Sequence, residues 1–147
     1  MAHRTWGRAA VAVAAVASMA AIATPAASAD VTAQAWYFNH YAYPDDGDSG
    51  GTSIYVSAYD GTSSVSAYFA AKGENITLRD YHDNDRPAIA KIWVGGSGPA
   101  VFYADGDNTD TFINESYDEN QTVYLQVCTS DSANAVCTTK SKGKGRT

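Results

Sequence analysis

The sequence predicts an all-β protein, a small antiparallel β-sandwich or small barrel of about eight or nine short strands with no substantial helix. Composition is the first observation: residues 30–147 hold sixteen aromatic residues, eight Val and five Ile, but only two Leu and no Met. β-Branched and aromatic side chains favour strands, whereas helices draw on Leu and Met. Turn-forming residues also recur about every 8–12 positions, which is typical of sandwiches and barrels. Finally, no segment longer than ten residues has a convincing helical period.

Residues 1–29 are predicted to be a cleaved signal peptide. Two Arg residues near the start precede an Ala- and Val-rich stretch over 9–23, and small residues place cleavage before Asp30. The apolar stretch is too short to span a bilayer. Its Ala-rich composition resembles the signal peptides of bacteria with GC-rich genomes, which implies a bacterial source. We therefore expect a secreted, extracellular protein whose single β domain covers residues 30–139.

A first strand is predicted at 31–43, where apolar and polar residues alternate loosely, and the segment 44–51, rich in Asp and Gly, is predicted to be a loop. The clearest local pattern follows it. Two alternating segments, 53–59 and 62–70, flank Asp60-Gly61. Asp-Gly between such segments predicts a type I′ β-hairpin, because Gly accepts a positive φ freely and Asp tolerates one.

The hairpin fixes which side chains share a face. If Asp60 and Gly61 are the two loop residues, Val56 lies opposite Val65 and Ile54 lies opposite Ala67. One face is then aliphatic, while the other carries Tyr and Ser side chains, among them Tyr55. The turn residues and the alternation therefore predict the same arrangement.

Further strands are predicted along the rest of the chain, separated by turns rich in Gly, Asp, Asn and Pro. Their expected ranges are 75–81, 88–94, 100–104, 111–115, 121–128 and 134–139. The last of these is expected to form a hairpin with 121–128, and a disulfide between Cys128 and Cys137 would join its two arms. An even pair of cysteines in an exported protein is most simply a structural disulfide.

Charge is distributed unevenly. Residues 30–139 contain sixteen acidic and four basic residues, and four more basic residues lie within 140–147. Nucleic-acid binding is not expected of so acidic a domain, since phosphate contacts require positive charge. The segment 140–147 alternates Gly or Ser with Lys or Arg and has nothing apolar to bury, so it is predicted to be a disordered basic tail.

Tyrosine is the most suggestive residue type for function. Ten Tyr exceed what a small core can hold, because a buried Tyr hydroxyl needs a partner. Tyr55, Tyr59 and Tyr68 are the candidate binding residues, as they lie on the face opposite the aliphatic one. A row of Tyr and Trp on a sheet can stack on sugar rings. The alternative is that these rings only cover the outer face of a thin sandwich.

Three groups of Asp in the loops are candidates for metal binding. Asp105, Asp107 and Asp110 have the densest oxygen spacing, and loop carboxylates suit Ca²⁺. Asp, Asn and Gly are also the residues of ordinary tight turns, which is the alternative. No other cofactor is expected beyond this weak Ca²⁺ site.

The functional hypothesis is a non-catalytic extracellular module that binds polysaccharide, cell-surface polymer or protein through the Tyr-rich face or the Asp-rich loops. No catalytic residue is assigned. The alternative is a small secreted hydrolase or an inhibitor-type protein acting through loops around His82 or 44–51. The latter loop contains Gly47-Asp-Ser-Gly-Gly51, which matches the sequence around a serine-protease nucleophile, but the chain is too short for the two barrels that such enzymes use.

Overall fold

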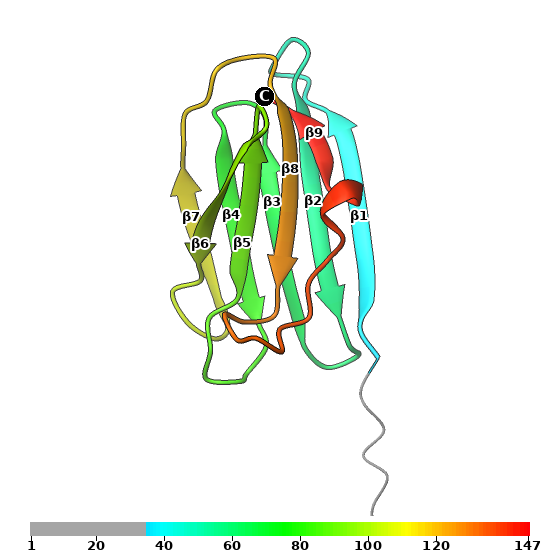
Figure 1. The fold of residues 1–147 in the computed structure, drawn as a ribbon, viewed down its shortest axis with the longest axis vertical. Helices are drawn as coiled ribbons and strands as arrows, with labels where there is room; N and C mark the ends of the chain where they lie inside the picture. Colours follow the sequence, from blue (N-terminus) through cyan, green and yellow to red (C-terminus); the bar gives the residue numbers. More distant parts are fainter. Residues whose placement is uncertain (1–34) are drawn as a thin grey trace, which may run out of the picture. The chain divides into compact units, whose positions relative to one another are not determined.

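Nine antiparallel β-strands make up most of residues 35–147, which are the residues described by the computed structural model (Figure 1). Six of the strands have the ranges Tyr37–Pro44 (β1), Thr52–Tyr59 (β2), Ser64–Ala70 (β3), Asn75–Tyr81 (β4), Ile89–Val94 (β5) and Ser97–Tyr103 (β6). The other three are Thr109–Asn114 (β7), Thr122–Cys128 (β8) and Lys144–Arg146 (β9), and Lys140–Lys142 forms one 3₁₀ turn. The all-β class and the strand number are confirmed. The predicted signal peptide, residues 1–29, lies outside the described residues.

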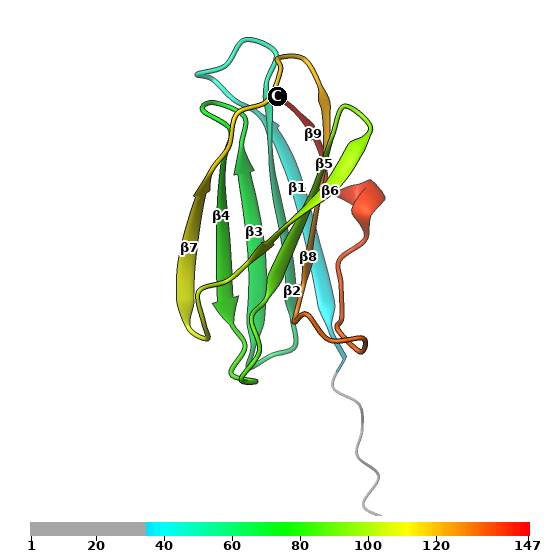
Figure 2. The same cartoon turned by 60° about the vertical axis from the view of Figure 1, so that its left-hand side comes forward.

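The strands form one sheet that curls into a half-barrel. Their order is β6-β5-β8-β9-β2-β3-β4-β7, and β1 pairs with β2 beside this path. Figure 2 shows β5 and β6 running obliquely across the strands β1 and β2. Because β6 and β7 stand at the two ends of the path, the half-barrel is open between them.

The core lies inside the half-barrel and follows the period of two expected for strands. Alternate residues of β2, β3, β4, β5 and β8 point inward and are almost completely excluded from water. The largest are Ile54, Val56, Val65, Phe69, Ile76, Leu78, Ile92, Val123, Leu125 and Val127. Because core side chains come only from alternate positions of each strand, the remaining positions of β1, β2, β3, β4 and β7 form an outer face.

The predicted β2–β3 hairpin is present, but its register was wrong by two residues. Ala58 lies opposite Val65 and Val56 lies opposite Ala67, so the loop contains four residues instead of two. The Asp60 side chain explains the longer loop, since its Oδ1 accepts hydrogen bonds from the backbone N–H groups of Thr62 and Ser63. A shift of two residues leaves every side chain on its predicted face.

The prediction of a disordered tail at 140–147 was also wrong. Lys144–Arg146 forms β9, which pairs with Thr122–Tyr124 of β8 and with Thr52 of β2. Gly145 is buried, whereas the flanking Lys144 and Arg146 are exposed. Gly and charged residues therefore alternate because this segment is a strand. Its charged side chains point outward, and its inward positions have no room for a side chain.

The chain reaches β9 through a short connection that the disulfide fixes. Cys128 at the end of β8 is bonded to Cys137, which confirms the predicted disulfide. The predicted strand at 134–139 is reduced to one bridge between these cysteines and to backbone hydrogen bonds from Thr138 to Val127 and from Thr129 to Val136. Within residues 35–147, no helix is long and apolar enough to cross a membrane.

Candidate functional site

Aromatic side chains collect on the outer face of the five strands β1, β2, β3, β4 and β7. Among residues 35–147, six of the nine exposed large hydrophobic side chains project from this face, and two further Tyr side chains are half-buried within it. We call this set the aromatic face: Tyr37, Tyr41, Tyr43, Tyr55, Tyr59, Tyr68, Tyr81 and Phe112. A large exposed apolar patch on one face of a small domain is typical of a binding surface.

The strand register arranges part of the aromatic face as a straight row across the sheet. Tyr41 lies opposite Tyr55, and Tyr55 lies opposite Tyr68. Thr77 continues the row on β4 and Phe112 ends it on β7. Four inter-strand spacings give the row a length of about 19 Å. The two ends are the most open, with Tyr41 57% and Phe112 77% exposed.

The rings within the face form two stacked pairs. The ring centroids of Tyr41 and Tyr55 are 6.1 Å apart, and those of Tyr43 and Tyr68 are 6.2 Å apart. Tyr43 lies opposite the small, buried Ser53, which leaves space for the Tyr43 ring to reach across β2 to β3. Partial burial and a hydrogen bond with the Tyr68 side chain raise the pKa of Tyr43 above its ordinary value.

A cavity of about 230 Å³ lies among these rings. Its lining residues come from four strands: Tyr43, Tyr55, Ser66, Tyr68, Thr77 and Arg79. It therefore combines aromatic walls, whose three rings carry phenol hydroxyls, with two aliphatic hydroxyl groups and one guanidinium. Aromatic surface with a few well-placed polar groups is the usual composition of a ligand site.

Asp110 fixes the side chain of Arg79, the polar edge of the cavity, by an ion pair and also accepts a hydrogen bond from Tyr81. The Arg79 Nε is 3.2 Å from Asp110 Oδ2, and the Tyr81 hydroxyl donates to Asp110 Oδ1 at 2.8 Å. The bond to Asp110 raises the pKa of Tyr81. The ion pair is made through Nε, and the guanidinium also carries two Nη groups. They are donors of the kind that binds a ligand hydroxyl or carboxylate.

Two of the three candidate residues from the sequence lie together in the structure. Tyr55 and Tyr68 are directly opposite each other and line the cavity. Tyr59 lies elsewhere on the same face, opposite Tyr37 and Ser64, and its hydroxyl donates to the Gly61 carbonyl. The three do not form one row.

Sequence reasoning missed Arg79 and did not single out Tyr41 or Tyr43 from the other tyrosines. The alternation of 75–81 holds a usable signal, because it places Arg79 on the side opposite Ile76 and Leu78. Bringing Arg79 beside the tyrosines, however, depends on the register of four strands, which the sequence pattern does not give.

The carboxylates of two of the three predicted calcium-binding residues, Asp107 and Asp110, are engaged in other contacts. Asp107 Oδ2 accepts the backbone N–H of Asp85, and Asp110 binds Arg79 and Tyr81. The backbone N–H of Asp105 donates to the Thr111 hydroxyl. In the part of the chain that the structure describes, no three His, Cys, Asp or Glu side chains are grouped so that they could hold a metal ion.

His82 has contacts that fit a role in loop structure. Its ring lies edge-on to Trp36, with centroids 5.3 Å apart, and its Nδ1 is 2.8 Å from the Asn84 side-chain nitrogen. Its backbone N–H donates to the buried carboxylate of Asp80. These contacts hold the chain where β4 turns away towards β5.

The loop 44–51 is organised by Asp45. The Asp45 carboxylate accepts hydrogen bonds from the backbone N–H groups of Gly47 and Lys72 and from the Ser53 hydroxyl. These bonds lower the pKa of Asp45. Ser49, the residue that resembles a protease nucleophile, lies in the exposed part of the loop. The contacts of Asp45 therefore account for the conformation of the loop.

Comparison of the chain with protein families, curated proteins and solved structures finds no match in any of the three.

Proposed function

We propose that the chain is a secreted, non-catalytic module that binds a polysaccharide along its aromatic face. The observation that supports this most directly is the row from Tyr41 to Phe112, with a cavity beside it that is lined by Tyr43, Tyr68 and Arg79. A polysaccharide offers both apolar ring faces and hydroxyl groups. This surface has the two complementary features, aromatic rings and hydrogen-bonding side chains.

The shape of the surface favours an extended polymer over a small molecule. The row crosses five strands, whereas the cavity beside it is only about 230 Å³. In this proposal one sugar unit enters the cavity, where the hydroxyls of Ser66 and Thr77 and the guanidinium of Arg79 bind its hydroxyl groups. Neighbouring sugar units lie over Tyr41 and Phe112 at the two exposed ends.

The charge of the chain favours a neutral polymer. Residues 30–139 carry twelve more acidic than basic residues, so a nucleic acid or another polyanion is repelled over most of the surface. The polar groups of the cavity are the hydroxyls of Ser66 and Thr77, the phenol hydroxyls of its three Tyr side chains, and a guanidinium already paired with Asp110. Such a set suits sugar hydroxyls.

In this proposal the protein is exported from the cell and meets the polysaccharide outside it. The disulfide between Cys128 and Cys137 is of the kind that forms in an oxidising, extracellular compartment. Cleavage of residues 1–29 would begin the mature chain at Asp30. Mass spectrometry of the protein recovered from culture medium tests this step directly, since an uncleaved chain or a cell-associated one would contradict it.

Binding to insoluble polysaccharides tests the function. The protein is mixed with cellulose, chitin, xylan and peptidoglycan, and the bound fraction is measured after centrifugation. We expect one of these polymers to retain the protein. Tyr41→Ala and Phe112→Ala are each expected to weaken that retention about tenfold, because each removes an exposed ring at one end of the row.

A matched control variant comes from a different surface. Tyr103→Ala removes a Tyr ring that is 54% exposed and lies on β6, outside the aromatic face. Retention of this variant is expected to equal that of the unmodified protein. Equal losses for Tyr103→Ala and Tyr41→Ala, or no retention on any of the polymers, would contradict the proposal.

A further inference from the structure

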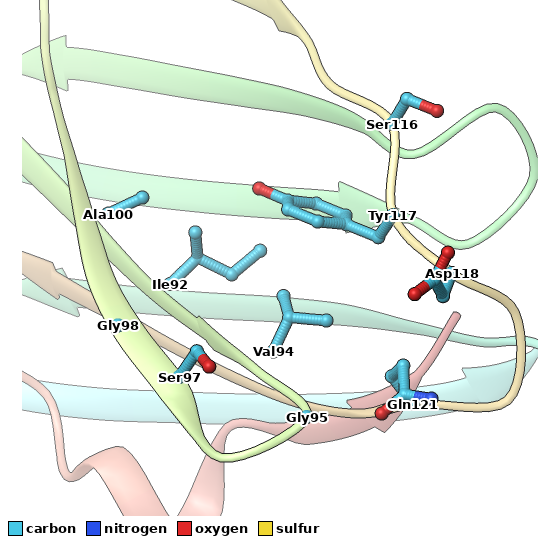
Figure 3. Close-up of a pocket in the computed structure, with 10 residues that line it drawn as sticks. All are labelled: Ile92, Val94, Gly95, Ser97, Gly98, Ala100, Ser116, Tyr117, Asp118 and Gln121. Atoms are coloured by element: carbon cyan, nitrogen blue, oxygen red, sulfur yellow. The ribbon is translucent and has the colours of Figure 1, made fainter.

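A second cavity lies at the open side of the half-barrel, away from the aromatic face (Figure 3). Its volume is about 570 Å³, within the usual range for small-molecule sites. The β5–β6 hairpin supplies an apolar wall of Ile92, Val94 and Ala100. The connection between β7 and β8 supplies the opposite wall, which contains Tyr117 and Asp118.

Tyr117 presents an unused polar group. Figure 3 shows its ring extending across the cavity from the β7–β8 connection towards Ile92 and Ala100. The hydroxyl at its end is buried and has no hydrogen-bond partner among residues 35–147. A buried hydroxyl without a partner is costly, so a ligand group that bonds to it gains more than a contact made in water.

The Tyr117 ring is held in position at its other end. Its backbone N–H donates to the Glu74 carboxylate, which lies in the β3–β4 turn. The ring also packs against the core cluster. The phenol is therefore a fixed part of the cavity wall.

The surroundings of this cavity are acidic. Asp118 is the only charged side chain among its ten lining residues. Burial, Glu115 and Glu74 together raise the pKa of Tyr117 to about 12. Negative charge at the mouth and along the connection favours a cation over an anion.

We propose that this cavity binds a small organic amine with an apolar body and a hydrogen-bonding group at its far end. The ammonium pairs with Asp118 at the mouth. The body lies between the Tyr117 ring and the wall formed by Ile92, Val94 and Ala100. The distal polar group bonds to the Tyr117 hydroxyl, which lies at the opposite end of the ring from Asp118 (Figure 3). The site is separate from the aromatic face and does not depend on polysaccharide binding.

Three probes of similar size separate the parts of this proposal. Tyramine has both the ammonium and a distal hydroxyl, phenethylamine lacks the hydroxyl, and 3-(4-hydroxyphenyl)propionate replaces the ammonium with a carboxylate. Titrations are followed by the NMR signals of the Ile92 and Val94 methyl groups. We expect tyramine to bind with a Kd of about 1 mM, phenethylamine about tenfold more weakly, and the carboxylate not measurably.

Two variants test the assigned residues. Asp118→Asn is expected to weaken tyramine binding about tenfold, because it removes the charge that pairs with the ammonium. Glu119→Gln is the matched control, since it neutralises the next acidic residue, which does not line this cavity, and little change is expected. Tyr117→Phe removes only the hydroxyl. It is expected to bring tyramine and phenethylamine to equal affinity while leaving the fold intact.

The results that would overturn the proposal are specific. One is equal binding of tyramine and the carboxylate. Another is a preference for tyramine over phenethylamine that persists in Tyr117→Phe. Absence of any saturable shift at Ile92 and Val94 with about 10 mM tyramine would do the same. None of these results bears on retention by polysaccharide, so the two proposals fail independently.

Discussion

Asp80 shows how a single buried side chain shapes a loop. It lies on β4 with 0% exposure, and its two carboxylate oxygens accept different backbone N–H groups. Oδ1 accepts from His82 at 3.1 Å and Oδ2 accepts from Ala88 at 2.6 Å. Asp80 therefore holds both ends of the connection between β4 and β5. Its burial raises its pKa in spite of these two bonds.

Asp80→Asn is expected to lower the free energy of unfolding by about 2 kcal/mol at pH 7. The amide has one acceptor oxygen, so one of the two backbone N–H groups loses its partner. Urea denaturation of the two proteins, followed by circular dichroism, measures the difference. A variant as stable as the unmodified protein would show that the two bonds do not hold the loop.

The same pair of proteins tests the direction of the Asp80 pKa. A folded-state pKa above the ordinary value of 3.8 means that the native chain binds the Asp80 proton more tightly than the unfolded chain. The unmodified protein should therefore gain stability relative to Asp80→Asn as the pH falls towards 4. Other acids, including Asp45 with its lowered pKa, are common to both proteins and cancel in the comparison. A deficit of Asp80→Asn that shrinks as the pH falls would contradict this assignment.

For single residues, the sequence predicted the outward-facing side chains of the candidate site better than it predicted which of them lie together. Alternation placed Tyr55 and Tyr68 on the outer face, and the structure has them there. Their neighbours Tyr43 and Arg79 come from β1 and β4. The approach of Tyr43 to Tyr68 depends on the small Ser53 between them, which is a property of the assembled sheet.

Among the elements, β9 joins the two parts of the sheet, β6-β5-β8 and β2-β3-β4-β7. Its pairing partners are β8 on one side and Thr52 of β2 on the other. Gly145 makes this close approach possible. A Cβ atom there would lie 2.4 Å from the Thr52 carbonyl oxygen and 2.5 Å from Ile54 Cγ1.

Gly145→Ala is expected to destabilise the protein by about 1–3 kcal/mol, because the added methyl group has no space unless backbone atoms move. Thermal unfolding followed by circular dichroism measures the loss. Ser141→Ala is the matched control, since Ser141 is exposed in the same segment. A Gly145→Ala protein with an unchanged melting temperature would mean that β9 does not pack against β2 as described.

The sequence predicted strands correctly where apolar and polar residues alternate. It failed where the inward positions are Gly and so carry no apolar side chain. The segments for β4, β5, β7 and β8 were found to within a few residues. The segment 140–147 looked disordered because a strand with Gly at its inward positions has no apolar side chains to reveal it. The turn between β2 and β3 was misjudged because Asp60 binds the backbone of Thr62 and Ser63, which extends the loop to four residues.

For the molecule as a whole, the disulfide restricts the segment of chain that leads from β8 to β9. Cys128 and Cys137 are nine residues apart and lie where the chain leaves β8. The bridge limits the positions that the following residues can reach. Those residues then enter the sheet as β9.

Loss of the disulfide is expected to lower the free energy of unfolding by about 2.7 kcal/mol, which is the chain-entropy value for a loop of about ten residues. Urea unfolding of the Cys128→Ser, Cys137→Ser double variant tests this, with the oxidised protein as reference. An unchanged stability, or a free thiol titrated in the freshly purified native protein, would contradict the role given to the bridge.

The pairing of Arg146 with Thr52 joins two positions that are 94 residues apart. During synthesis, β2 emerges from the ribosome long before its β9 partner exists. Contacts between distant parts of a chain form slowly, because a large loop must be ordered first. The edge of β2 near Thr52 therefore stays without its β9 partner until the last stretch of the sheet has been translated, so the two parts of the sheet can join only after the rest of the strands exist.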